Sequence, residues 1–331
     1  MKVVIPVAGV GLRLRPLTYT QPKPLIPIAG KPILAHIIDQ FLDIGINDFV
    51  FIIGYLGDKI KHYVESHYPG IQKTFVHQME RKGLGHAIYS AKNELEGCND
   101  MSILLGDTIL ELDLKAFTKV PYSCIGVKKV ENPREFGVVE QDEHGFVLKM
   151  IEKPSIPITN LAIVGLYKIK EVDLLIEALE YNIQNDIRTN QEFQLTDALQ
   201  RLIMQGIQMK TMEVDNWFDC GRRDIVLETN ASMLEQSEEA QKDYGNYINS
   251  IIIPPVYIGE HCTIENSIIG PHVSIGENTT IQRAAIQNSI IGNYAAIQEI
   301  VLQSSIIGSD TAIKGSIHSL NIGDNTEMDL G

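Results

Sequence analysis

The segment Pro6–Pro27, with the sequence PVAGVGLRLRPLTYTQPKPLIP, combines glycines and cationic side chains and contains no acidic residue. The chain as a whole has a formal net charge of -14 at pH 7, and its first carboxylate is Asp39. Five cationic residues precede that carboxylate: Lys2, Arg13, Arg15, Lys23 and Lys31. Backbone N–H groups of a glycine-rich turn bind anions, and clustered cations attract them. The sequence therefore predicts an anion site, suited to phosphate groups, near the start of the chain.

Two common phosphate-binding loops do not match this segment. A Walker A loop requires G-x-x-x-x-G-K-[ST], and no Gly-Lys-Ser/Thr occurs in the chain. The dinucleotide fingerprint G-x-G-x-x-G has Gly9 and Gly11 but has Leu14 at its third glycine, and the acidic residue expected about twenty positions later is missing. Gly9 and Gly11 alone also fit a plain strand-to-helix turn with solvated arginines, so the flanking residues decide between the two interpretations.

Those flanking residues, AGVGLRLRPLT followed by PKPLIPIAGKPIL, resemble the signature of the sugar-1-phosphate nucleotidyltransferases, the NDP-sugar pyrophosphorylases. The resemblance implies a loop that wraps the triphosphate of an NTP, with backbone contacts from Ala8, Gly9 and Gly11. It also implies that Arg13 holds the β- and γ-phosphates and that Lys23 holds phosphate groups nearer the reacting centre. The chain departs from the family at Ala8, where a glycine is usual, and at Leu12, where a threonine is usual.

The resemblance continues in order along the chain to about residue 230. Six further stretches carry it: HQMERKGLGHAIYSAK, LLGDT, EFGVVEQDEHGFVLKMIEKP, NLAIVGLY, EFQLTDAL and NWFDCG. The implied site residues are Gln78 and Gly83 at the nucleobase, Gly137, Glu152 and Lys153 at the sugar and its phosphate, and Asp107 and Asp219 as metal ligands.

The implied reaction is an in-line attack by a sugar phosphate on the α-phosphorus of an NTP, which yields NDP-sugar and pyrophosphate. The sugar phosphate is already an anionic nucleophile, so the protein must mainly position the substrates and neutralise charge. Mg²⁺ favours one or two carboxylates together with phosphate oxygens and water, which suits Asp107 and Asp219. Catalysis would then depend on Arg13, Lys23 and Lys153. The expected substrates are a hexose-1-phosphate, most of all glucose-1-phosphate, with dTTP or UTP, because the Gln78 amide matches the N3–H and O4 edge of both bases.

Two different sequence patterns along the chain predict the elements that position these residues. Short apolar runs alternate with amphipathic ones up to Leu234, with strands expected at VVIPVAG, DFVFIIG, TFVHQ, SILLGD and SCIGVKKV, and helices at PILAHIIDQFLDIG and GLGHAIYSAKNEL. This alternation predicts an α/β domain with a doubly wound, mostly parallel, Rossmann-like sheet. Ligands bind such sheets at the carboxyl ends of strands, where the cationic turn lies.

The second sequence pattern, in the C-terminal part of the chain, is a series of isoleucines at a fixed period. The Ile-Gly pairs at Ile258, Ile275, Ile291, Ile307 and Ile322 are separated by 17, 16, 16 and 15 residues. Such a period predicts a solenoid, and this one resembles the hexapeptide-repeat left-handed β-helix. The predicted organisation is a nucleotidyltransferase domain at residues 1–234, an acidic linker at 235–249 and a left-handed parallel β-helix at 250–331.

Composition narrows the partners and the compartment. The acidic balance argues against nucleic-acid binding, which needs a basic face. The four cysteines, which are far apart in the sequence, match neither a disulfide framework nor a zinc site and fit a reducing compartment. The first apolar run is too short for a signal peptide core or a membrane span. A cytoplasmic protein without a membrane partner is expected.

Two alternatives keep the fold but change the function. In a bifunctional enzyme the β-helix would also transfer acyl groups, although only about five coils with His261, His272 and His318 are available and no inserted loop presents them. In a regulatory subunit the activity would be lost, which the intact cationic and acidic site residues argue against. A coil stack leaves its last layer uncovered unless something caps it, so a homo-oligomer formed through the β-helix is expected.

Overall fold

The computed structural model describes residues 1–241 and 247–316 and divides into two compact units. The first unit contains Met1–Pro27 and Lys31–Val226, and the second contains Ile28–Gly30 together with the chain from Leu227 onward. Part of the predicted linker, residues 242–246, and the last fifteen positions of the predicted β-helix, 317–331, lie outside the described residues. The boundaries at 234 and 250 stay a prediction, and each unit is described by itself.

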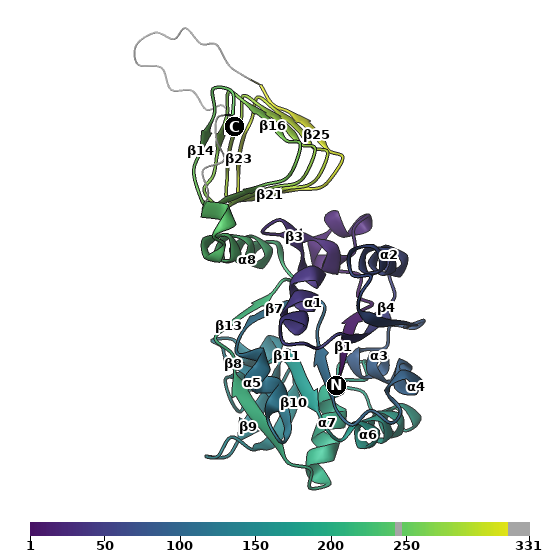
Figure 1. Cartoon of the computed structure of the whole chain (residues 1–331). Coiled ribbons are helices and arrows are strands. Elements are labelled where there is room, and N and C mark those ends of the chain that lie inside the picture. Colours follow the sequence, from purple (N-terminus) through teal and green to yellow (C-terminus); the bar gives the residue numbers. More distant parts are fainter. Residues whose placement is uncertain (242–246, 317–331) are drawn as a thin grey trace. The chain divides into compact units, whose positions relative to one another are not determined.

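A mixed nine-stranded sheet forms the centre of the first unit (Figure 1). Its main path runs β10-β9-β11-β6-β1-β4-β5, and β8 joins β11 and β12 beside that path. The strands are β1 (Lys2–Val7), β4 (Asp48–Ile53), β5 (Gln72–His77), β6 (Met101–Leu104), β8 (Ser123–Lys129), β9 (Gly137–Gln141), β10 (Val147–Glu152), β11 (Leu161–Ile169) and β12 (Met209–Glu213).

The parallel half of the sheet consists of β6, β1, β4 and β5, paired in that order. Strands buried on both faces read as unbroken apolar runs, and Val3, Val4 and Ile5 are fully buried in β1. All five predicted strands are present, with ends within three residues of those expected. The helices of this unit are α1 (Ile33–Asp43), α2 (Gly57–His67), α3 (Leu84–Ser90), α4 (Lys92–Leu95), α5 (Leu114–Lys119), α6 (Val172–Gln184) and α7 (Leu195–Met204), and α8 (Arg223–Gln236) begins here.

The second predicted helix is divided in two at Ala91. The Ala91 N–H bonds to the Ile88 carbonyl at 3.0 Å, which tightens the last turn of α3. The Ser90 hydroxyl also donates to the His86 carbonyl at 2.8 Å, a side-chain bond that competes with regular helix hydrogen bonding. The apolar period continues through the break, which is why the sequence indicated one helix.

Antiparallel pairs complete the unit. β9 and β10 form a hairpin, and β11 runs antiparallel to β6, β8 and β9. A separate two-stranded ribbon joins β7 (Thr108–Glu111) to β13 (Asn216–Asp219), segments more than a hundred residues apart in the sequence. This ribbon brings the two predicted metal carboxylates to one place.

The second unit is a left-handed parallel β-helix, shown as the stacked triangular coils in Figure 1. Three parallel sheets of four strands form its walls, in the orders β14-β17-β20-β23, β15-β18-β21-β24 and β16-β19-β22-β25. The strands are β14 (Ile251–Ile252), β15 (Val256–Ile258), β16 (Thr263–Glu265), β17 (Ile268–Ile269), β18 (Val273–Ile275), β19 (Thr280–Gln282), β20 (Ala285–Gln287), β21 (Ser289–Ile291), β22 (Ala296–Gln298), β23 (Val301–Gln303), β24 (Ile306–Ile307) and β25 (Ala312–Lys314).

Its core confirms the predicted repeat. Ile264, Ile281 and Ile297 occupy the same register position in successive coils and are almost fully buried. Four of the five Ile-Gly pairs fall in one sheet, at the ends of β15, β18, β21 and β24, and the fifth, at Ile322, lies outside the described residues. The solenoid prediction is therefore confirmed in the part of the chain that the structure covers.

Across residues 1–241 and 247–316, none of the helices combines the length and the apolar character that crossing a bilayer requires.

Candidate active site

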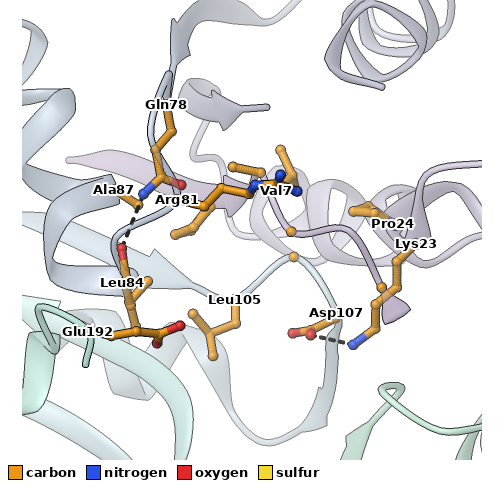
Figure 2. A pocket seen from close by; sticks show the side chains of 16 residues that line it. Val7, Lys23, Pro24, Gln78, Arg81, Leu84, Ala87, Leu105, Asp107 and Glu192 are labelled. Carbon is orange, nitrogen blue, oxygen red and sulfur yellow. Dashed lines mark hydrogen bonds and ion pairs between the residues drawn. The ribbon is translucent and has the colours of Figure 1, made fainter. Parts of the chain in front are cut away.

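Two cavities adjoin in the first unit. The loop cavity, about 400 Å³, is lined by Ala8, Gly9 and Gly11 after β1 and by Gln78 and Gly83 (Figure 2). The hairpin cavity, about 290 Å³, is lined by Gly137 of β9, Glu152 of β10 and the adjacent Lys153. Both cavities are lined by Leu84, Leu105, Asp107 and Glu192. A ligand in one cavity can therefore meet a ligand in the other beside Asp107.

The glycine-rich turn has a conformation that only glycine adopts easily. Gly11 has φ +67°, and a Cβ at this position would lie 3.0 Å from Thr18 Cγ2 and 3.1 Å from Lys23 Cβ. The buried Thr18 hydroxyl donates to the Gly11 carbonyl at 2.8 Å, which fixes the turn. A Cβ on Gly9 would meet open space, so this position leaves room for a ligand close to the backbone. Leu12 is 62% exposed and packs little.

Gln78 follows β5 and reaches the loop cavity as a buried amide, 8% exposed. Its Nε2 donates to the Gly83 carbonyl at 3.2 Å and lies 3.3 Å from His86 Nδ1. These contacts orient Oε1 as the acceptor for a ligand. Burial lowers the pKa of His86, which favours its neutral form. Gly83 has φ +105°, and a Cβ there would lie 2.7 Å from the Phe193 carbonyl oxygen.

The β7–β13 ribbon explains why Asp107 and Asp219 converge. Thr108 pairs with Asp219 in the antiparallel register, and the Cys220 N–H donates to the Asp107 carbonyl at 3.0 Å. Lys23 Nζ forms an ion pair with Asp107 Oδ2 and lies 3.9 Å from Asp219 Oδ1. Burial, followed by the nearby Asp107 charge, raises the pKa of Asp219, while Lys23 opposes that shift.

The donor chemistry of this pair suits a hard divalent cation that the substrates help to bind. Among residues 1–241 and 247–316, no group of three or more His, Cys, Asp or Glu side chains is arranged to hold a metal. Two carboxylates alone leave most of an octahedral shell to phosphate oxygens and water, which is how Mg²⁺ commonly binds. Asp107 and Asp219 therefore fit a Mg²⁺ that binds together with a phosphorylated ligand.

The hairpin cavity has a buried carboxylate in its wall. Thr196 Oγ1 donates to Glu152 Oε2 at 2.7 Å, and burial raises the pKa of Glu152 although this bond opposes the shift. A Cβ on Gly137 would lie 3.0 Å from Glu152 Oε2, so glycine keeps that oxygen accessible. Lys153 has φ +42° and places its Nζ 3.9 Å from Glu152 Oε1. The cavity thus offers acceptors for hydroxyl groups beside a cation for a phosphate.

All twelve predicted site residues line at least one of the two cavities. Arg13 is among them. It lines the hairpin cavity, where its charge opposes the rise in the pKa of Asp219. The expectation that it holds the β- and γ-phosphates stays a prediction.

Sequence reasoning missed several residues of the cavity walls. Trp217 lines the hairpin cavity, and its ring centroid lies 4.7 Å from that of Phe136. Its buried Nε1 has no hydrogen-bond partner within the described part of the chain. Thr196 lies in the EFQLTDAL stretch, and the signal for its role was its position in that motif. Glu192, from the same stretch, lines both cavities.

The fold, the glycine turn and the paired carboxylates define a nucleotide-handling α/β domain. Residues 2–236 match the family model described as "Nucleotidyl transferase", and the chain belongs to this family.

Two relatives illustrate the match. The Bifunctional protein GlmU of Methanocaldococcus jannaschii is 39% identical over 238 residues, which cover 71% of this chain and 55% of that protein. The UTP–glucose-1-phosphate uridylyltransferase AglF of Haloferax volcanii is 30% identical over 248 residues, covering 72% of this chain and 99% of that protein. The chain spans between about half and two thirds of the length of the relatives that match most strongly.

A solved structure gives the same fold. The crystal structure of a UDP-glucose pyrophosphorylase complexed with UDP-glucose superposes with a TM-score of 0.62 at 24% identity, covering 71% of this chain and 99% of that one. The similarity supports the mixed Rossmann-like architecture of the first unit.

Proposed function

We propose that the chain is a sugar-1-phosphate nucleotidyltransferase that joins a pyrimidine NTP to a hexose-1-phosphate and releases pyrophosphate. One observation supports this most strongly. The cavity with phosphate-loop and base-reading residues adjoins the cavity with hydroxyl acceptors and a lysine, and Asp107 lines both. Two substrates bound this way would meet at a carboxylate suited to a metal ion.

In the proposed reaction, an oxygen of the sugar phosphate attacks the α-phosphorus and the bond to the bridging oxygen of pyrophosphate breaks. The nucleophile is already ionised, so no general base is required. Lys153 would hold the sugar phosphate, while the loop backbone and Lys23 would stabilise charge on the triphosphate. Arg13, located beside Asp219, would add positive charge near the same centre.

Asp107 and Asp219 would hold Mg²⁺, which when bound supplies charge neutralisation for the phosphates. Glu152 would accept hydrogen bonds from sugar hydroxyls and thereby orient the nucleophile. The family is typically dependent on a divalent metal, which agrees with this assignment.

The base assignment follows from the Gln78 amide. With Nε2 directed to Gly83 and His86, Oε1 is oriented to accept the N3–H that uracil and thymine share. A methyl group separates these bases and is worth about 1–3 kcal/mol in a fitted apolar pocket, so dTTP and UTP should both react. Glucose-1-phosphate is the proposed acceptor, and AglF is a relative whose name states that substrate.

A pyrophosphate-release assay with four NTPs and a panel of hexose-1-phosphates tests the proposal. We expect turnover with glucose-1-phosphate and with dTTP and UTP, whose kcat/KM values should agree within about two orders of magnitude. ATP and GTP should be much poorer substrates, because a purine is larger and leaves buried polar groups unpaired. A purine as the best substrate would contradict the base assignment, and no release from any pair would contradict the function.

We further propose that the protein self-associates through its β-helix. Ile251, Ile268, Ala285 and Val301 form a ladder in register on one outer wall, and Val301 is 78% exposed. Monomeric proteins rarely expose long apolar patches. Light scattering at micromolar concentration should give a mass above that of the 36.9 kDa chain, and a monomer would refute the proposal.

The similarity to the Bifunctional protein GlmU supports the bifunctional alternative, although the described histidines of the β-helix do not themselves form a site for a second activity. His261 is exposed beside Glu260, and His272 Nε2 is engaged by Glu235 Oε1 at 2.9 Å, while His318 lies outside the described residues. None of the four cysteines, all of them within the described residues, forms a disulfide, which supports the reducing cytoplasm as the proposed compartment.

A further inference from the structure

Lys23 already occupies the position between the two carboxylates that a cation would take. Its Nζ contacts Asp107 Oδ2 (Figure 2). The same Nζ lies 3.9 Å from Asp219 Oδ1, and the Lys23 side chain is only 12% exposed. The carboxylates are more accessible, at 34% and 41% exposure. The lysine is thus held inside the site while the acidic oxygens remain open to a ligand.

Two glycines make this approach possible. A Cβ on Gly11 would lie 3.1 Å from Lys23 Cβ, so the phosphate loop packs directly on the stem of the lysine. A Cβ on Gly221 would lie 3.4 Å from Lys23 Nζ and 3.0 Å from Asp219 Oδ1. The site is therefore shaped around the lysine head group, and Lys23 also lines the loop cavity.

We propose that Lys23 is an internal cation of the free protein, which a divalent metal replaces when the metal arrives with the nucleotide. In the free protein Nζ neutralises Asp107 and Asp219. On binding of the metal–nucleotide complex, Nζ would leave the carboxylates for phosphate oxygens in the loop cavity, and the metal would take its place. This inference rests on the proposed function, since it uses the same carboxylates and the same nucleotide.

The charge distribution explains the exchange. Two carboxylates close together in a partly buried site repel each other unless a cation lies between them, and this repulsion contributes to the raised pKa of Asp219. A metal ion alone must displace a lysine that has no other described anion nearby. A metal ion that brings phosphate oxygens supplies Nζ with new partners. The free protein should therefore bind divalent cations weakly, and nucleotide should strengthen their binding.

Binding of Mn²⁺ to the full chain without nucleotide, followed by electron paramagnetic resonance, tests the exchange. We expect Lys23→Met to bind Mn²⁺ at least about tenfold more tightly than the unmodified protein, because the competing cation is gone. Lys31→Met is the matched control, since Lys31 also forms an ion pair with an aspartate, Asp39, which does not line either cavity. It should leave Mn²⁺ affinity unchanged.

When a nucleotide analogue is added, the increase in Mn²⁺ affinity should be larger for the unmodified protein than for Lys23→Met. A non-hydrolysable dTTP or UTP analogue should raise the Mn²⁺ affinity of the unmodified protein. In Lys23→Met most of this increase should be lost, because the phosphates of the analogue no longer have the lysine to bind. Adding Asp107→Asn to Lys23→Met should abolish tight binding. Lys23→Gln, neutral but polar, serves as a second variant if the methionine variant does not fold by circular dichroism.

Equal or weaker Mn²⁺ binding by both Lys23 variants would overturn the exchange. If the unmodified protein still releases pyrophosphate, the proposed function stands and only the inference fails. If no substrate pair releases pyrophosphate, the function fails whatever the Mn²⁺ affinities are.

Discussion

The walls of the β-helix are built from residues at equivalent, repeated positions, whereas the walls of the two cavities are built from residues at positions that occur once. In the β-helix, Ile264, Ile281 and Ile297 fill equivalent positions in successive coils, so each makes nearly the same contacts. In the first unit, Gln78 and Asp107 each occupy a position with no equivalent. In the repeated coils many similar residues share the stabilisation of the fold, whereas in the cavities a few residues brought together from distant parts of the chain carry the proposed chemistry. The comparison predicts that substitutions in the β-helix change the free energy of unfolding and that substitutions in the cavities change turnover.

A buried isoleucine in the coil stack gives the largest expected effect. Ile281→Ala removes a fully buried side chain stacked between two others, which should lower the free energy of unfolding by about 2–5 kcal/mol. Thr263→Ala, at an exposed position on a different wall from the apolar ladder, should change it by no more than about 0.5 kcal/mol. Urea unfolding measures both. A loss of turnover per folded molecule in Ile281→Ala would break the comparison.

The carboxylate proposed as a metal ligand, Asp107, gives the largest expected change in rate. Asp107→Asn should lower kcat by roughly 10²–10³, because an oriented charge at the reacting centre is lost. Circular dichroism should show an unchanged fold. Asp39→Asn breaks an ion pair that does not line either cavity and should retain turnover. Near-normal turnover of Asp107→Asn with Mg²⁺ would show that the carboxylate is not a metal ligand.

Alanine substitutions at two glycines distinguish the effect of backbone strain from the effect of steric crowding in the site. Gly83 and Gly97 both have positive φ, so alanine at either should cost about 1–2 kcal/mol of stability. A Cβ at Gly97 meets open space, whereas at Gly83 it approaches the Phe193 carbonyl oxygen at 2.7 Å beside Gln78. Only Gly83→Ala should therefore raise the KM for the NTP, by roughly 10-fold to 100-fold. Equal NTP KM values for the two variants would contradict the base assignment.

Glu152 gives the smallest effect and one that depends on pH. Burial raises the pKa of Glu152, and its acceptor form is the ionised one, so kcat/KM for the sugar phosphate should fall as pH falls through that raised pKa. The phosphate of the substrate also titrates, with a second pKa near 6. Glu152→Gln separates the two, because it should lower kcat/KM about tenfold at neutral pH and leave only the substrate's titration. If kcat/KM of Glu152→Gln falls at low pH in the same way as that of the unmodified protein, the whole fall is due to titration of the substrate phosphate.

The sequence allowed different depths of prediction in the two units. The fixed isoleucine period identified the β-helix directly, since a solenoid repeats one local rule. In the first unit, β-branched runs located the strands, but the break at Ala91 depends on the Ser90 bond to His86, which periodicity does not record. The grouping of Ile28–Gly30 with the second unit depends on contacts remote in sequence, such as the bond from the Ala29 N–H to Asn230 Oδ1.

The site shows the same limit. Because each motif is local, the motifs located stretches of the chain that line the two cavities. The approach of Asp219 to Asp107 depends on the β7–β13 ribbon, and the contact between Lys23 and Asp107 depends on two glycines far apart in the chain. Both are products of tertiary packing. Arg13 and Trp217 both line the hairpin cavity, and no local sequence pattern states which cavity a side chain faces.

The central claim is that the loop cavity binds the NTP and the hairpin cavity binds the sugar phosphate. Steady-state KM values for both substrates in Gln78→Leu and Glu152→Gln test it most directly. We predict that Gln78→Leu raises the KM for dTTP or UTP about tenfold or more and leaves that for glucose-1-phosphate unchanged, and that Glu152→Gln does the reverse. The opposite pattern, or equal effects of each variant on both KM values, would contradict the assignment of the two cavities.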